Sequence, residues 1–141
     1  MKLCLQRGEV DYNEQDGNFT HFRVDGCLIK DNDVKKCDCL IVFSSRSLTK
    51  PVFFTVEFKS SASYDLSNIQ SQIQTCLDKI SLDLGRYNDK VVPVPVFIAP
   101  NHRKHIQRWL LAYRVEYRSM KLLMSHLKTG DNILNALERK D

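Results

Sequence analysis

Two short apolar stretches of the sequence each carry charged residues at one end. Asp38 lies at the start of an apolar run that ends at Phe43, and Glu57 and Lys59 end the run that begins at Pro51. Strand side chains alternate between the two faces of a sheet, so Glu57 and Lys59 share one face about 7 Å apart. Phe58 then points to the opposite face, into the core. If the two runs are neighbouring strands of a hairpin, Asp38 meets this acid and this lysine at one point.

Such a meeting predicts a metal site. Two carboxylates that lie close together repel each other unless a cation or a lysine lies between them. Oxygen ligands favour Mg²⁺ or Mn²⁺ over zinc. We therefore expect Asp38 and Glu57 to bind Mg²⁺ or Mn²⁺, with Lys59 close to the metal but not bound to it.

The spacing of apolar residues predicts a mixed α/β chain with a single domain over residues 1–141. Predicted strands cover residues 19–29, 37–43, 51–58, 91–99 and 115–124, and predicted helices lie within 1–15, from 66 to 85, from 101 and from 131. A three-strand meander followed by a crossover helix adds a further strand to the same sheet. The order α-βββ-α-β-α-β-α thus predicts a mixed sheet flanked by helices.

Several residues carry more local expectations. Ser67 is the expected N-cap of the helix that ends at Gly85. Pro93 and Pro95 favour an edge position or an irregular start for the strand that contains them. Trp109 is expected to pack in the core from the next helix.

Length and cysteine content limit the class of protein. A chain of 141 residues is long enough for one hydrophobic core. The first residues do not resemble a signal peptide, and no run reaches the roughly 18 apolar residues of a membrane span. Five cysteines, without Cys-x-x-Cys spacing, favour reduced and mostly buried thiols over a disulfide framework or a zinc site. We expect an intracellular, cytoplasmic protein with no membrane partner.

The net charge of +4 is unevenly distributed. Residues 1–59 carry 9 basic and 9 acidic side chains, and residues 60–141 carry 12 basic and 8 acidic ones. Much of the excess lies between His102 and Lys121, where Glu116 is the single acid. A basic segment of this kind is typical of a surface that contacts nucleic acid, although a solvated helix face is the alternative. The expected phosphate contacts are Arg103, Lys104, Arg108, Arg114 and Arg118.

The acidic and basic residues also resemble a known pattern. Asp38 in Cys37-Asp38-Cys39-Leu40-Ile41 is followed, after eighteen residues, by Glu57-Phe58-Lys59. This arrangement resembles the PD-(D/E)xK superfamily of restriction-endonuclease-like nucleases, which includes Holliday-junction resolvases and exonucleases. The resemblance covers roughly residues 7–99, and Cys37 stands at the variable position where the superfamily name has proline.

The resemblance implies a fold and a set of roles. It implies a restriction-endonuclease-like core, with α-βββ-α-β order followed by a further strand and helices. Asp38 and Glu57 would bind Mg²⁺, together with the backbone carbonyl of Phe58, and Lys59 would position or activate water. A glutamine often follows on the next helix, and Gln72 is our choice among Gln70, Gln72 and Gln74 because it borders the buried stripe.

The resemblance also implies an acid from the first helix. Glu9 is our first choice for this acid and Glu14 our second.

We expect a metal-dependent nuclease that hydrolyses phosphodiester bonds of DNA. The alternatives are a catalytically silent module of the same fold that binds nucleic acid or joins a larger assembly, and a nuclease directed at RNA. A partner subunit could supply targeting, since so short a chain has little room for a sequence-reading domain. A homodimer would provide the two active sites that a double-strand cut needs.

Overall fold

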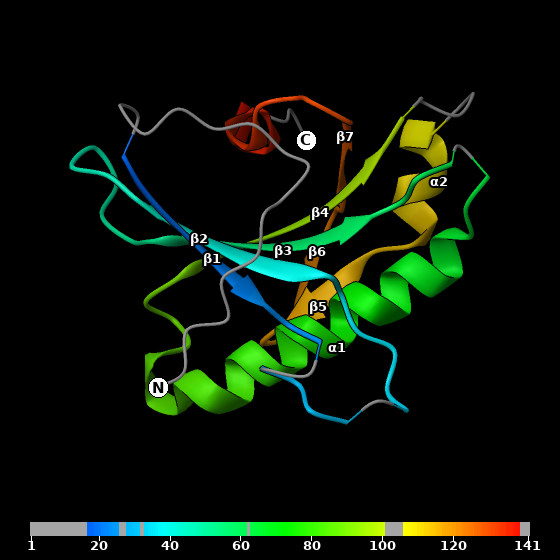
Figure 1. The fold of residues 1–141 in the computed structure, drawn as a ribbon. Coiled ribbons are helices and arrows are strands. Elements are labelled where there is room, and N and C mark those ends of the chain that lie inside the picture. The colour runs from blue at the N-terminus through cyan, green and yellow to red at the C-terminus, as the bar shows by residue number, and fades with distance from the viewer. Residues whose placement is uncertain (1–16, 26–27, 32, 62, 101–105, 139–141) are drawn as a thin grey trace.

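A five-stranded mixed sheet forms the centre of the protein (Figure 1). The computed structural model describes residues 17–25, 28–31, 33–61, 63–100 and 106–138. The sheet has the order β1-β2-β3-β4-β7, with strands β1 (Asn18–Arg23), β2 (Cys39–Ser44), β3 (Val52–Phe58), β4 (Val92–Ala99) and β7 (Ser125–Lys128). The first three strands are antiparallel, whereas β3, β4 and β7 are parallel. The α/β class and the mixed sheet are therefore confirmed, and the predicted helix within residues 1–15 lies outside the described residues.

Helix α1 (Leu66–Leu84) is the crossover between β3 and β4. Its buried stripe contains Leu66, Ile69, Ile73, Cys76, Leu77 and Ile80, at the helical spacing expected from the sequence. The prediction of Ser67 as N-cap is wrong. Asp65 has the extended backbone of a cap, and its side chain accepts the N–H of Ser67 at 2.9 Å. The helix ends at Gly85 as predicted, because a positive φ of 54° is easy for glycine.

The sheet is covered on both faces. Helix α1 lies along one face, and the short helix η3 (Ile133–Glu138) lies along the other (Figure 1). The first core contains Leu40 and Phe97 from the sheet with the buried stripe of α1. The second core contains Ile41, Phe54 and Val96 with Ile133. Residues that alternate along β2 and β3 therefore enter different cores.

The two prolines belong to β4, which is an interior strand of the sheet, but at their positions β4 is paired with β3 alone. The Val92 N–H donates to Pro51, and the Ile98 carbonyl accepts from Lys59, so even-numbered residues of β4 direct their backbone groups to β3. Pro93 and Pro95 direct theirs to the opposite side, where β7 pairs only from Val96 onward. The missing N–H groups thus break no ladder bond. The expected edge position is wrong for the whole strand, but the first half of β4 has one partner only.

The C-terminal third differs most from expectation. The predicted strand over residues 115–124 is a separate hairpin of β5 (Val115–Tyr117) and β6 (Met120–Leu122). Strand β7 was not predicted, and the last helix is a 3-10 helix rather than an α-helix. Trp109, on α2 (Ile106–Ala112), is 44% exposed, so its predicted core position is wrong. Ile106 and Leu110 instead supply the buried face of α2.

A disulfide joins Cys37, just before β2, to Cys76 on α1. The prediction of reduced thiols is therefore wrong for this pair, whose Cα atoms lie 6.1 Å apart only because the sheet packs against α1. Cys39 is a free, buried thiol, as expected. Cys4 and Cys27 lie outside the described residues.

Within the described ranges, no helix combines the length and the apolar character that a membrane crossing requires.

Candidate functional site

Asp38 is fixed at the start of β2 by the end of β3. Its N–H donates to the Val56 carbonyl at 2.9 Å, and its Oδ2 accepts the N–H of Phe58 at 2.7 Å. Cys39 pairs with Val56 in the antiparallel register, so the next step along the two strands places Asp38 opposite Glu57. The hairpin geometry expected from the sequence is therefore present, and the two carboxyl groups lie side by side.

Glu57 is a buried acid with an incomplete set of partners. Its side chain is 2% exposed. Oε2 lies 3.3 Å from the ammonium of Lys59, whereas Oε1 meets no hydrogen-bond donor within the described residues. The pKa of Glu57 is raised to about 8, chiefly by burial and then by the hydrogen bond and negative charge of Asp38, while Lys59 acts in the opposite direction. The site therefore favours either a proton or a cation between the two carboxyl groups.

Lys59 connects the acids to helix α1. Its backbone N–H donates to the Ile98 carbonyl at 2.8 Å, which fixes the end of β3 against β4. Its side chain is 28% exposed, and Nζ lies 3.4 Å from Oε1 of Gln72. Of the three glutamines considered from the sequence, the structure brings Gln72 to Lys59. Gln70 and Gln74 turn to the other side of α1, where Gln74 binds the Glu116 backbone of β5 and Gln70 binds the Arg114 carbonyl just before this strand.

The carbonyl of Phe58 faces the same side as Asp38. The Phe58 N–H reaches the Asp38 carboxylate, and in a strand the N–H and C=O of one residue point to the same side. The Phe58 ring lies on the opposite face, where it packs against the second core, as expected. One backbone carbonyl and two carboxylates thus converge at the end of β3.

These groups suit a hard cation. Oxygen atoms are the ligands that Mg²⁺ and Mn²⁺ prefer, and Glu57 Oε1 is a buried oxygen without a donor among the described residues. Within those residues, no three His, Cys, Asp or Glu side chains gather into a cluster. Glu9 and Glu14, the two candidates for a further acid, lie outside the described residues, as do Arg103 and Lys104.

Sequence reasoning missed two neighbours of the site. Cys39 lies one residue after Asp38, and burial together with the charges of Asp38 and Glu57 raises the pKa of its thiol to about 12. His126 belongs to the same row of the sheet as Glu57, because Glu57 pairs with Phe97 and Phe97 pairs with His126. Its ring stacks on Phe97 with 4.6 Å between centroids. The position of His126 could not be found from the sequence, since β7 itself was not predicted, whereas Cys39 is adjacent to Asp38 in the sequence and was expected only as a buried thiol.

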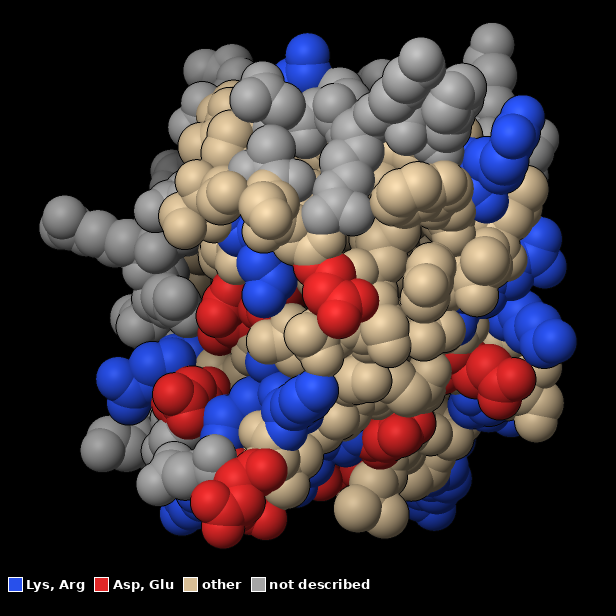
Figure 2. Space-filling view, turned by 90° about the vertical axis from the view of Figure 1, so that its right-hand side faces the viewer, with Lys and Arg blue, Asp and Glu red and all other residues tan. Residues whose placement is uncertain are grey.

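The basic residues that the structure describes do not form one continuous patch. Arg108 lies on α2, Arg114 comes just before β5, and Arg118 is at the tip of the hairpin; all three are exposed. Figure 2 views the side on which α2 lies in Figure 1, and there acidic side chains are interspersed with the Lys and Arg side chains. Any contact with a polyanion on this side is therefore local.

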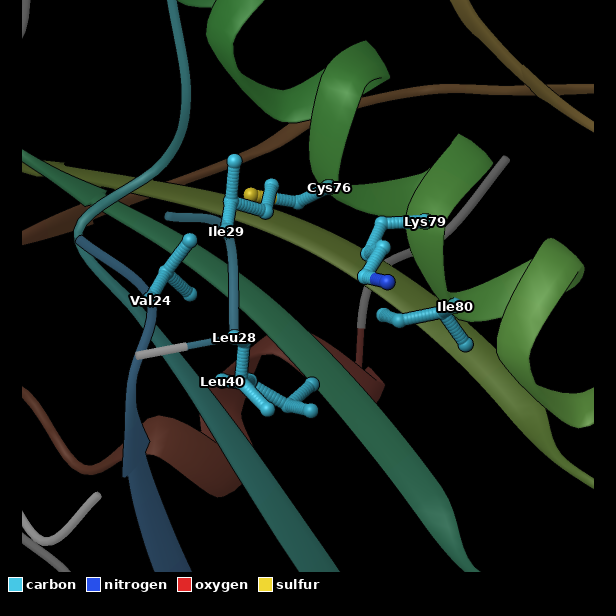
Figure 3. Close-up of a pocket in the computed structure, with 7 residues that line it drawn as sticks. All are labelled: Val24, Leu28, Ile29, Leu40, Cys76, Lys79 and Ile80. Carbon is cyan, nitrogen blue, oxygen red and sulfur yellow. The ribbon is translucent and has the colours of Figure 1, made fainter. Parts of the chain in front are cut away.

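One apolar pocket between the sheet and α1 is too small for a ligand. It lies between Val24 and Leu40 of the strand region and Cys76 and Ile80 of α1 (Figure 3). Its volume of about 20 Å³ has room for about one water molecule. The open end of β3 is thus a better candidate for chemistry than this apolar space.

Comparison with protein-family models, with curated proteins and with solved structures finds no match to this chain.

Proposed function

We propose that this chain is a metal-dependent nuclease that hydrolyses phosphodiester bonds of DNA. The observation that carries the proposal is the pair Asp38 and Glu57, which the register of β2 and β3 places opposite each other beside Lys59. A buried carboxyl pair with a raised pKa needs a proton or a cation. Perturbed acids of this kind are common at catalytic sites.

Each residue would have a distinct role. Asp38, Glu57 and the Phe58 carbonyl would hold Mg²⁺ or Mn²⁺. Bound there, the ion supplies positive charge for the phosphoryl oxygens and makes a bound water more acidic. The Lys59 ammonium would orient the attacking water, and Gln72 would hold that ammonium in place through the contact at 3.4 Å.

The arrangement of elements also supports the proposal. An antiparallel meander, a crossover helix and a parallel strand follow one another, and the acids lie at the end of the third strand of the meander. This is the arrangement that a restriction-endonuclease-like core would have, and it agrees with the PD-(D/E)xK resemblance of Asp38, Glu57 and Lys59. The Lys59 side chain at the end of β3 is partly exposed to solvent, so a phosphodiester could approach it.

Cleavage assays test the proposal directly. Supercoiled plasmid, branched DNA and RNA are incubated with Mg²⁺ or Mn²⁺, and with EDTA as the metal-free control. We expect metal-dependent cleavage of DNA that Glu57→Gln abolishes and that Asp83→Asn, at an exposed acid near the end of α1, leaves intact. Cleavage that persists in EDTA or in Glu57→Gln would overturn the proposal. Binding of DNA without cleavage by the wild-type chain would instead identify a catalytically silent module, and preference for RNA would identify an RNA nuclease.

A further inference from the structure

The outer face of the β5–β6 hairpin borders an open hollow of about 330 Å³. The hairpin has two faces: Val115 and Tyr117 are buried toward α1, whereas Arg114, Glu116 and Lys121 are exposed on the outer side. These three charged side chains line the hollow together with Leu111 and Ala112 at the end of α2. The hollow is therefore built from two elements that the catalytic proposal does not use.

The hollow is basic. Glu116 and Lys121 are opposite one another in the hairpin register. No ion pair among the described residues involves Arg114 or Lys121, so the ammonium of Lys121 is not bonded to the neighbouring Glu116 carboxylate. Two cations against one acid leave a positive charge in a concave surface, which suits an anion.

The turn of the hairpin carries a further exposed cation, Arg118, which does not line the hollow and which has a cost in backbone energy. Arg118 and Ser119 both have positive φ angles, of 51° and 68°. A two-residue turn with this geometry is most stable with Asn-Gly, because residues with a Cβ atom are strained there by about 1–2 kcal/mol each. Arginine at position 118 makes the turn less stable than Asn or Gly would, so the stability of the turn does not explain why arginine is there. Strain of this kind is commonly kept where a side chain has a function.

Two glutamines fix the hairpin to helix α1. The Gln74 side chain accepts the Glu116 N–H and donates to the Glu116 carbonyl, both at 2.8 Å. Gln70 donates to the Arg114 carbonyl at 2.7 Å. The amide of Gln74 thus pairs with β5 as a neighbouring strand would. The hollow therefore has a fixed position relative to α1.

The same helix carries Gln72 to Lys59, so α1 lies between the hollow and the candidate catalytic site. Positions 70 and 72 lie about 200° apart around a helix that is about 10–12 Å in diameter, which separates the two places by roughly 12 Å. Residues 66–77 of α1 include no charged side chain, and the first acid on the helix is Asp78. A polyanion could cross this part of α1 without meeting a negative charge.

We infer that the hollow binds backbone phosphates of a nucleic-acid strand that crosses the first half of α1 to the Asp38–Glu57 site. The inference rests on the proposed function for the position of the scissile bond, but binding at the hollow does not require cleavage. A phosphate at Arg114 and Lys121 would lie about three to four nucleotides from the scissile phosphate, at about 3.4 Å per nucleotide of duplex. The substrate would therefore need several nucleotides on one side of the cut.

The test measures binding in a variant that cannot cleave. In the Glu57→Gln background, the affinity for a fluorescent duplex is measured by anisotropy between 50 and 200 mM salt, with and without Arg114→Ala/Lys121→Ala. Loss of two phosphate contacts should lower the salt slope by up to about 1.8, so the advantage of the parent over the double variant should shrink roughly tenfold over this range. The matched control is Arg46→Ala/Lys50→Ala, which removes the same charge at the exposed turn between β2 and β3.

The outcomes separate the two proposals. Equal salt slopes for the hollow variant and the Arg46/Lys50 control would overturn the hollow as a phosphate site, even if the wild-type chain cleaves DNA. A slope lowered only in the hollow variant would support it, even if no cleavage is found. Circular dichroism of both double variants should match the parent, because all four side chains are exposed.

Discussion

Glu57 is the residue whose chemistry depends most on its surroundings. It is buried, it lies beside Asp38, and only Lys59 offers it a positive charge among the described residues. These three causes can be separated by experiment, because burial and Asp38 raise its pKa and Lys59 lowers it.

The stability of the metal-free protein should fall as pH rises from about 4.5 to about 8. Below the lower value Glu57 is protonated in both states; between the two values the native state keeps a proton that the unfolded state has lost. The native state then binds more protons, so the free energy of unfolding decreases with pH and levels off above about 8. The loss should be on the order of a few kcal/mol. Urea unfolding in EDTA between pH 4 and 9 measures it, and Glu57→Gln should remove this part of the dependence.

Single substitutions next to Glu57 should move this pH window in opposite directions. Asp38→Asn removes a negative charge and should shift the window to lower pH, whereas Lys59→Met removes a positive charge and should shift it to higher pH. The measurement is the midpoint of the pH dependence of the free energy of unfolding in EDTA. An unchanged midpoint in both variants would show that burial alone controls the pKa of Glu57.

The sequence allowed the meeting of Asp38 and Glu57 to be predicted, because two-residue alternation and a hairpin between neighbouring strands fix which side chains face each other. Gln72 could be chosen by its position at the edge of a helical stripe. The N-cap could not be placed, because Asp65 and Ser67 are both good caps and backbone geometry decides between them. His126 could not be connected to the site because its strand has no clear sequence signal.

At the scale of elements, α1 is a helix with three functions. One side packs on the sheet, Gln72 faces Lys59, and Gln70 and Gln74 bind the start of the β5–β6 hairpin, at the carbonyl of Arg114 and at Glu116. The side-chain amide of Gln74 bonds the backbone of β5 in the way that a neighbouring strand of a sheet would. The hairpin therefore depends on two side chains of the helix for its position.

Gln74→Ala should loosen the hairpin without unfolding the sheet. The substitution leaves the N–H and C=O of Glu116 without their partners, which should cost about 1–3 kcal/mol locally. Amide exchange of Glu116 and its neighbours, measured by NMR, should become faster, while exchange in β3 and β4 should not change. Gln107→Ala, at an exposed glutamine on α2, is the control. Unchanged exchange at Glu116 would show that this clamp does not hold the hairpin.

The β5–β6 hairpin and strand β7 were not predicted for one reason, which is that their sequences carry no clear signal of a turn or of a long strand. The run from Val115 to Met124 contains no Gly, Pro or Asn, so nothing in it indicates a turn, yet Arg118 and Ser119 turn the chain with positive φ. Strand β7 follows directly and is only four residues long. By contrast, the central meander and α1 have long, regular patterns, and they were predicted with the correct order and pairing.

At the scale of the whole molecule, one covalent bond joins the two parts of the chain that build the site. Cys37 lies next to Asp38, and Cys76 lies one turn after Gln72 on α1. The pairing could not be predicted, because the two cysteines are 39 residues apart and meet only when the sheet packs on the helix. The odd number of cysteines led us to expect free thiols, whereas the packing of α1 on the sheet brings Cys37 and Cys76 together.

Removal of this disulfide should lower the stability of the whole domain. A bond that closes a loop of 39 residues restricts the unfolded chain, and its loss should cost about 2–4 kcal/mol. Cys37→Ser and Cys76→Ser should each lower the urea midpoint, and the double variant should lose about as much as either one, because both remove the same bond. Cys39→Ala is the control for loss of a buried thiol. A peptide that links Cys37 to Cys76 should be found by mass spectrometry of a non-reduced digest. If no such peptide is found, and if a reducing agent leaves the wild-type midpoint unchanged, the two cysteines are not bonded in solution, and the helix is held against the sheet by packing alone.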